Sequence, residues 1–466
     1  MAIDFRRAEH ETALIEWQLV NACALEKNLD DLLPTIMAHD ASSENKERNK
    51  QYKDRASWFG ATAFTMQGLI GTAFENPPEI ELPTGLEYLR TDCDGEGTDL
   101  QQQMQTALGG VLRNGRAGLM TTYPALSEAA SRRDVMDGRA TATTHVIEAK
   151  RIINWWTQKD GSRVKLGGVI FTGTREAWDD YEIKSQNIIR ELHLDETGSP
   201  MDRTWVQDGK TGKWMPEEAL PIVGATGQPL SEIPFVFVGA MDNTASVDRP
   251  PLLALSRLNR AHYRNSADFE ESAFYAGQAV PYVEPVDGTP SREDLEEAKS
   301  SGWYIGCREV VLGKMGFAQA QPNLVSREAM RDKEDQMKAL GARLLDPGSV
   351  QKTATESAGE MRAQHSVLSL AVSNIEDAYN RALVFAGEFM GSDAGTVSMQ
   401  KEYMRRDVAD QRITSFLALW DRGLAGAGEA FRVLSGAGIV DPDKDPGDYA
   451  EEVAARGGMI EGGAVE

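Results

Sequence analysis

The spacing of apolar residues changes from one part of the chain to the next, and it predicts which parts are helical. Up to about residue 139 they recur mainly every three or four positions, which is typical of helices that bury one face. Residues 100–113 form one such run, and Asn114-Gly115 predicts its end. Residues 76–83 contain three prolines and should end the preceding helix, because proline lacks a backbone donor. That preceding helix is predicted to be continuous through Tyr52, Arg55, Phe59, Thr62 and Met66.

Between residues 140 and 240 the pattern changes to short runs of β-branched and aromatic residues, which predict strands. Turn residues separate the runs, and Asp208-Gly-Lys-Thr-Gly212 between two tryptophans predicts a hairpin. We therefore expect an antiparallel sheet beside the helices, and an α+β fold class. The predicted strands are residues 143–149, 164–172, 188–194 and 235–238.

Helical spacing returns beyond residue 249. Arg249-Pro-Pro251 should open a helix that runs to about Gly277, and residues 326–345 should form another. A short mixed module lies between these two helices. It is predicted to contain strands near residues 280–283 and 309–312 and a helix over residues 291–300.

Two overlapping capping boxes, Thr353 with Glu356 and Ser357 with Glu360, predict the start of a long helix that ends near residue 390. A further helical region is expected over residues 407–434. The apolar positions of the long helix follow a spacing of three or four residues: Met361, Leu368, Val372, Ile375, Tyr379, Ala382, Ala386 and Phe389.

The composition is that of a globular protein with an acidic surface. The 466 residues are 41% hydrophobic and 26% charged, which excludes wholesale disorder. Asp and Glu number 72 against 49 Lys and Arg, so the net charge is −23. Proteins that grip DNA normally carry a basic surface, so any contact with DNA should be weak and independent of base sequence.

Neither a membrane span nor a secretory leader is expected. No apolar run approaches the ~18 residues of a membrane span, and no apolar leader follows Met1. The cysteines, Cys23, Cys93 and Cys307, lie far apart and form no CxxC motif, which suggests reduced thiols in a cytosolic setting.

Motifs that could carry chemistry are incomplete. Gly209-Lys210-Thr211 resembles the end of a phosphate-binding loop, but Thr204 stands where that loop needs a glycine. Residues 441–452 place acids at ligand positions of a calcium loop, yet Pro446 occupies the position of its glycine. An exposed acidic turn is the favoured interpretation, and cation binding is left open. We expect no cofactor, no metal site and no catalytic activity.

Several weak sequence features follow one another in a fixed order. The opening helix ends in Gly71-Thr-Ala-Phe74 and paired prolines, and a turn at residues 111–118 leads to Ile152-Ile-Asn-Trp155. Ile233-Pro-Phe-Val-Phe-Val238 precedes the helix that begins near Leu252, and Lys352-Thr-Ala-Thr-Glu356 opens the long helix. In this order the chain resembles portal proteins of tailed bacteriophages, in a divergent branch, from about residue 45 to about residue 443.

The resemblance implies a division of the chain into wing, stem, clip and crown. The stem would consist of two helices, residues 251–279 and 325–346, with the clip, residues 280–324, between them. The wing would combine residues 1–250, helical at first and β-rich from about 140, with the helix and return segment 357–405. Residues 347–356 would form a tunnel loop, and residues 406–466 a helical C-terminal crown.

The resemblance also implies a function and partners. Portal subunits assemble as rings, dodecameric in the capsid, at one capsid vertex of the virion after synthesis in the host cytoplasm. Double-stranded DNA is packaged and ejected through the ring. The partners would be the terminase large subunit, a head-completion or adaptor protein, and capsid and scaffold proteins. Another head–tail connector, a minor capsid protein, or a soluble enzyme with an unrecognised acidic site remain as alternatives.

Two sets of site residues follow from this layout. The tunnel loop would present Ser349, Val350, Gln351, Lys352 and Thr353 to the DNA channel. The stem helices would meet neighbouring subunits through charges of opposite sign. These interface residues are Arg257, Arg260 and Arg264 on the first helix and Glu328, Asp332 and Asp335 on the second.

Overall fold

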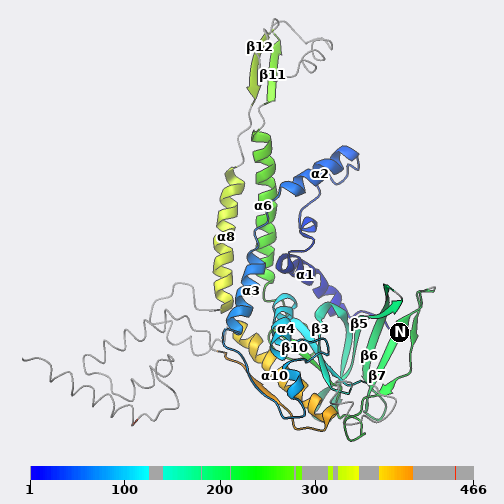
Figure 1. Cartoon of the computed structure of the whole chain (residues 1–466). Coiled ribbons are helices and arrows are strands. Elements are labelled where there is room, and N and C mark those ends of the chain that lie inside the picture. Colours follow the sequence, from blue (N-terminus) through cyan, green and yellow to red (C-terminus); the bar gives the residue numbers. More distant parts are fainter. Residues whose placement is uncertain are drawn as a thin grey trace, which may run out of the picture. The chain divides into compact units, whose positions relative to one another are not determined.

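The computed structural model describes residues 2–124, 140–179, 181–209, 211–277, 280–285, 313–318, 324–345, 367–401 and 447. The chain divides into two compact units, Met1–Lys401 and Glu402–Glu466. The first unit holds the helices and sheets labelled in Figure 1. The second unit, which contains the predicted crown, lies outside the described residues apart from Gly447.

The N-terminal part of the first unit is helical, as the spacing predicts. It contains α1 (Ala8–Leu25), η1 (Leu29–Leu32) and η2 (Glu87–Arg90), and then α4 (Leu100–Asn114). Asp99 caps α4, because its carboxylate accepts a hydrogen bond from the backbone N–H of Gln102 at 2.7 Å. α4 ends at Gly115, whose φ is 69°, and a Cβ there would lie 2.2 Å from the carbonyl oxygen of Asp248. The sequence therefore needs glycine at this end of the helix.

The continuous helix predicted through Tyr52 and Met66 is wrong. The chain forms α2 (Ser43–Arg55) and α3 (Ala61–Ala73), with a non-helical segment between them. Side chains of α6 (Leu253–Gly277) satisfy the backbone at this break. Asn259 accepts a hydrogen bond from the Thr62 N–H at 3.0 Å and donates one to the Phe59 carbonyl at 2.7 Å. The partner that ends the helix is distant in sequence, so local spacing could not reveal it.

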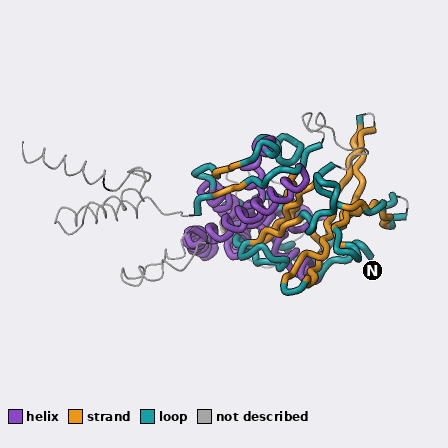
Figure 2. Tube along the Cα trace, turned by 90° about the horizontal axis from the view of Figure 1, so that it is seen from below, coloured by secondary structure: helices purple, strands orange, loops and turns teal. Residues whose placement is uncertain are grey.

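Two antiparallel sheets form the β-rich part and establish a mixed α+β architecture. The order of the smaller sheet is β10-β2-β3, and the larger sheet has the order β4-β5-β6-β7-β8 with β9 beside β7. Figure 2 shows most of the strands on the side of the N-terminus, with most of the helices beside them. The strands are β2 (Arg116–Thr122), β3 (Thr143–Glu148), β4 (Ile152–Asp160), β5 (Arg163–Asp179), β6 (Glu182–Leu194), β7 (Pro200–Gln207), β8 (Trp214–Pro216), β9 (Leu220–Pro221) and β10 (Phe235–Gly239).

The predicted strands and the tryptophan-flanked hairpin are confirmed. Gln207 pairs with Trp214, and Trp205 with Pro216, across the turn that the sequence predicts. The core of this part is apolar and is built from both sheets. Its buried residues are Met120, Ile147, Ile152, Trp155, Val169, Phe171, Leu192, Ile233, Phe235 and Phe237.

α10 (Val367–Met390) packs against both sheet and helices. It contacts β2, β10 and α4, and Tyr379 donates a hydrogen bond to Gln103 at 3.2 Å. After α10 the chain forms β13 (Thr396–Ser398), which pairs with β1 (Glu79–Glu81). The apolar spacing predicted for this helix is confirmed at seven positions that are buried: Leu368, Val372, Ile375, Tyr379, Ala382, Ala386 and Phe389.

α6 and α8 (Leu324–Leu345) lie side by side (Figure 1). Both helices are confirmed near their predicted bounds. β11 (Val280–Pro285) and β12 (Gly313–Ala318), which lie between them in sequence, pair as an antiparallel hairpin. The strand predicted near 280–283 is thus confirmed, and its partner lies just beyond the predicted residues 309–312.

Several predictions lie outside the described residues. They are the helix over 291–300, the strand over 309–312, the tunnel loop over 347–356, the capping boxes with Met361, the helical region over 407–434, and the acidic residues 441–452 apart from Gly447.

Candidate functional site

The first candidate site is the pair of helices α6 and α8, which carries the predicted interface residues. His262 of α6 lies 3.2 Å, Nε2 to Oε1, from Glu334 of α8, and Met337, three residues further along α8, is buried. Asn259 near the start of α6 and Gly341 near the end of α8 both face α3. The two helices are therefore antiparallel, as a chain that leaves along one and returns along the other requires.

The three predicted arginines on α6 face elements of the same subunit. Arg257 forms an ion pair with Glu16 of α1 at 2.8 Å, and Arg264 donates a hydrogen bond to the Leu32 carbonyl at 3.1 Å. Burial raises the pKa of the Cys23 thiol to about 12, and the positive charge of Arg260 opposes this shift. These contacts link α6 to α1 and η1.

The predicted acids on α8 are exposed. Asp335 pairs with Lys338 one turn later at 3.0 Å, and this hydrogen bond raises the pKa of Lys338. Glu328 and Asp332 alternate with Arg327 and Arg331, so the exposed face of α8 carries both signs of charge. The structure brings none of these acids to the α6 arginines. Their role between subunits stays a prediction, and the tunnel-loop residues lie outside the described part of the chain.

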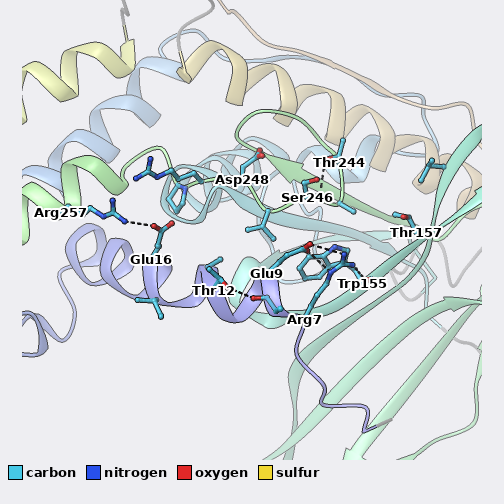
Figure 3. Close-up of a pocket in the computed structure, with 18 residues that line it drawn as sticks. Arg7, Glu9, Thr12, Glu16, Trp155, Thr157, Thr244, Ser246, Asp248 and Arg257 are labelled. Carbon is cyan, nitrogen blue, oxygen red and sulfur yellow. Dashed lines mark hydrogen bonds and ion pairs between the residues drawn. The ribbon is translucent and has the colours of Figure 1, made fainter.

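The second candidate site is an open pocket of about 1190 Å³ between the start of α1, the strands β4 and β5, and the loop before α6 (Figure 3). Sequence reasoning missed this pocket, because its walls come from three separate segments. Ile15 and Val164 line it, and these residues are 73% and 63% exposed. Its polar lining includes Arg7, Glu9, Glu16, Asp248, Arg249 and Arg257.

Ion pairs and hydrogen bonds fix most of the charged groups of the pocket. The Arg7 guanidinium lies 2.9 Å from the Glu9 carboxylate, donates a hydrogen bond to the Trp155 carbonyl at 2.6 Å and lies over the Trp155 ring. Asp248 accepts a hydrogen bond from the Met241 backbone N–H at 2.7 Å. Arg249 is exposed, and among the described residues it has no ion-pair partner. The pocket therefore offers one exposed arginine that no described residue neutralises.

Arg116 lies behind the pocket and is almost completely buried. Its guanidinium carbon is 4.0 Å from the centre of the Trp155 ring and 3.9 Å from that of Phe237. None of its three guanidinium nitrogens has a hydrogen-bond partner among the described residues. Desolvation lowers the pKa of Arg116 to about 9, and the nearby Glu9 carboxylate opposes this shift. The sequence gives one indication of this buried arginine: Arg116 directly follows Gly115 and begins the buried strand β2.

Within the described residues, no group of three or more His, Cys, Asp and Glu side chains is placed to hold a metal ion. None of the described helices combines the length and the apolar character needed to cross a membrane. Two ion pairs of the pocket, Arg7 with Glu9 and Arg257 with Glu16, lie beside exposed apolar side chains. Such a lining suits the docking of a mixed polar and aromatic segment.

Comparisons with known proteins add a partial match. Residues 251–390, well under half of the chain, match a family described as "Domain of unknown function (DUF4055)". The matched segment starts just before α6 and ends with α10. No curated protein matches the chain.

Among solved structures, the chain is similar to proteins in "Virion of native gene transfer agent (GTA) particle", at 13% identity and a TM-score of 0.41, over 81% of this chain and 89% of that one. It is also similar to one in "Neck of native GTA particle computed with C12 symmetry", at 12% identity and 0.39, over 82% and 90%. A third is "Neck of empty GTA particle computed with C6 symmetry", at 12% and 0.41, over 81% and 90%. TM-scores this low do not establish a shared fold.

Proposed function

We propose that this chain is the subunit of a phage portal, a ring at one capsid vertex through which double-stranded DNA is packaged and ejected. In this role it has no catalytic activity of its own. It docks the terminase large subunit during packaging, and later head-completion or adaptor proteins. The ring, dodecameric in the capsid, resides in the virion after assembly in the host cytoplasm beside capsid and scaffold proteins.

The antiparallel pair α6 and α8 is the observation that carries this proposal. The sequence resemblance requires a stem of two helices that leave and re-enter an α+β wing, with a small clip between them. The structure supports this, since Asn259 and Gly341 both face α3 and the hairpin β11–β12 lies between the helices in sequence. At 1.5 Å per residue, α6 would be about 37 Å long, which is enough to project from a wing.

The charge of the chain supports a passage for DNA and not a grip on it. A net charge of −23 repels the duplex, so a ring of such subunits would keep DNA centred and free to slide. Lys352 is the one basic residue in the predicted tunnel loop. Repeated around the ring, it would supply weak contacts that salt screens.

Deletion of residues 350–352 tests the proposal in a phage that carries this gene. We expect rings to assemble, because the deletion spares the helices on both sides, whereas packaging or retention of DNA should fail. The measurement is the mass of assembled rings together with the amount of full-length genome in purified heads. A matched deletion of residues 226–228, in the turn after β9, should leave packaging intact. Normal packaging by the variant that lacks residues 350–352 would contradict the prediction that these residues form a tunnel loop.

A further inference from the structure

The strands β5 and β6 continue well past the sheet that contains them. β4 pairs with β5 only as far as Phe171, and β7 pairs with β6 only from Ile188 onward. Residues 174–179 and 182–187 thus pair only with each other in the described sheet, and we call the segment 174–187 the arm. Arg175 anchors the base of the arm through two hydrogen bonds to Glu217, at 2.8 and 3.0 Å.

The end of the arm carries large apolar side chains in solvent. Trp178 is 76% exposed and Tyr181 is 99% exposed. Ile183, at 51%, pairs directly opposite Trp178, so these two side chains lie on one face of the ribbon. A two-stranded ribbon is marginally stable alone, and clustered exposed aromatic residues mark an interaction surface. The three side chains together form what we call the arm tip.

The pocket described above has features complementary to the arm tip. It exposes Ile15 and Val164 to solvent and, at about 1190 Å³, exceeds the ~300–1,000 Å³ typical of small-molecule sites. The arm contains two basic and four acidic residues, so its net charge is negative. Arg249 at the pocket carries the opposite charge, is exposed, and has no ion-pair partner in the described structure. Aromatic residues that contact arginines are typical of the energetically important centre of a protein interface.

The arm tip of a subunit cannot reach the pocket of the same subunit. Val164 at the pocket and Trp178 at the arm tip lie on one strand, β5, and at ~3.3 Å per residue the strand holds them roughly 45 Å apart. Between these two residues every position of β5 except Gly167, at an irregularity in the β4 pairing, is paired with β4 or β6, so the strand cannot fold back. Any arm tip of this protein that fills the pocket must therefore belong to another copy.

We propose that the arm tip of one subunit inserts into the pocket of the next, so that each copy supplies a tip on one side and a pocket on the other. Such a contact uses two different surfaces of the subunit and is heterologous, and a heterologous contact closes into a ring when its rotation permits. The proposal rests on the proposed function in one respect: the portal role requires a closed ring, whereas the contact itself requires only two copies.

Disulfide cross-linking of the full chain tests the contact. The variant Ile15→Cys/Tyr181→Cys would be made with Cys307→Ser, while Cys23 and Cys93, both buried, stay in place. We expect oxidation to link copies beyond the dimer, because each subunit offers one tip and one pocket. The control Phe64→Cys/Tyr181→Cys uses an equally exposed site on α3, with Phe64 79% exposed, and should give no such series. Absence of links, or equal links in both variants, would overturn the proposal.

A second measurement uses assembly. Trp178→Ser/Tyr181→Ser/Ile183→Ser should leave the subunit folded, because these side chains are exposed, and should weaken self-association by at least about tenfold. Phe64→Ser is the control and should assemble as the unaltered chain does. Rings that form normally in the triple variant would overturn the arm contact and leave the portal proposal intact. Cross-links specific to Tyr181 in a chain that forms no ring would support the contact and contradict the portal.

Discussion

Arg116 is a buried cation held between two aromatic rings instead of by a counter-ion. Replacing it with methionine, which is apolar and of similar length, removes a desolvated charge, and such exchanges are often neutral or stabilising. We expect Arg116→Met to change the free energy of unfolding by less than about 1 kcal/mol or to raise it. Arg116→Ala leaves a cavity and should lower it by about 2 kcal/mol or more. Urea unfolding measures the free energy of unfolding of both variants. An equal decrease in the two variants would show that the guanidinium group itself stabilises the fold.

Two buried thiols make stability depend on alkaline pH. Burial raises the pKa values of Cys23 and Cys93 from 9.0 to about 12. Between these values the unfolded chain loses protons that the folded chain keeps, so this contribution to stability is full below pH 9 and is lost as the pH rises toward 12. The urea midpoint should fall between pH 8 and pH 11, and by less in Cys23→Ala/Cys93→Ala. An equal fall in both proteins would contradict this assignment.

At the residue scale the sequence predicted interface charges but not their partners. Arg257 and Arg264 were correctly placed on one helix, yet the structure pairs them with Glu16 and the Leu32 carbonyl. Such contacts depend on how α1 and α6 pack, which no local spacing encodes. Arg116 was missed for the same reason, because the aromatic rings around it come from β4 and β10.

At the scale of elements, the break between α2 and α3 depends on Asn259. This fully buried residue satisfies the Thr62 N–H and hydroxyl and the Phe59 carbonyl. Asn259→Ala should lower the free energy of unfolding by about 2 kcal/mol or more, because buried backbone groups lose their partners. Asn265→Ala, on the same helix and less buried, is the control and should cost under about 1 kcal/mol. A loss of the same size in both variants would contradict a specific role for the Asn259 hydrogen bonds, because alanine favours a helix more than asparagine does.

Elements were predicted best where burial sets the sequence pattern. The spacing of α10 was predicted because its apolar positions face a core, and β10 because a strand buried in a sheet is rich in apolar residues. The predicted strands 164–172 and 188–194 stopped where β5 and β6 leave the sheet. Beyond that point the arm buries no face, so Glu176 and Ser185 stand opposite each other and no alternation marks the strands.

At the scale of the whole molecule, the proposed assembly connects the two sites. The antiparallel α6 and α8 would form the stem around the channel, and the arm and the pocket would connect neighbouring wings. The order of wing, stem and clip was predicted from the sequence. The arm and the pocket were not, because the arm buries no face and the walls of the pocket come from three separate segments.

Electron micrographs of the purified protein in negative stain test whether the chain forms a ring. We expect rotationally symmetric rings with a central hole, together with a native mass that is a whole multiple of the subunit mass. A compact single subunit, with no rings at any protein concentration that gives well-separated particles, would contradict this expectation.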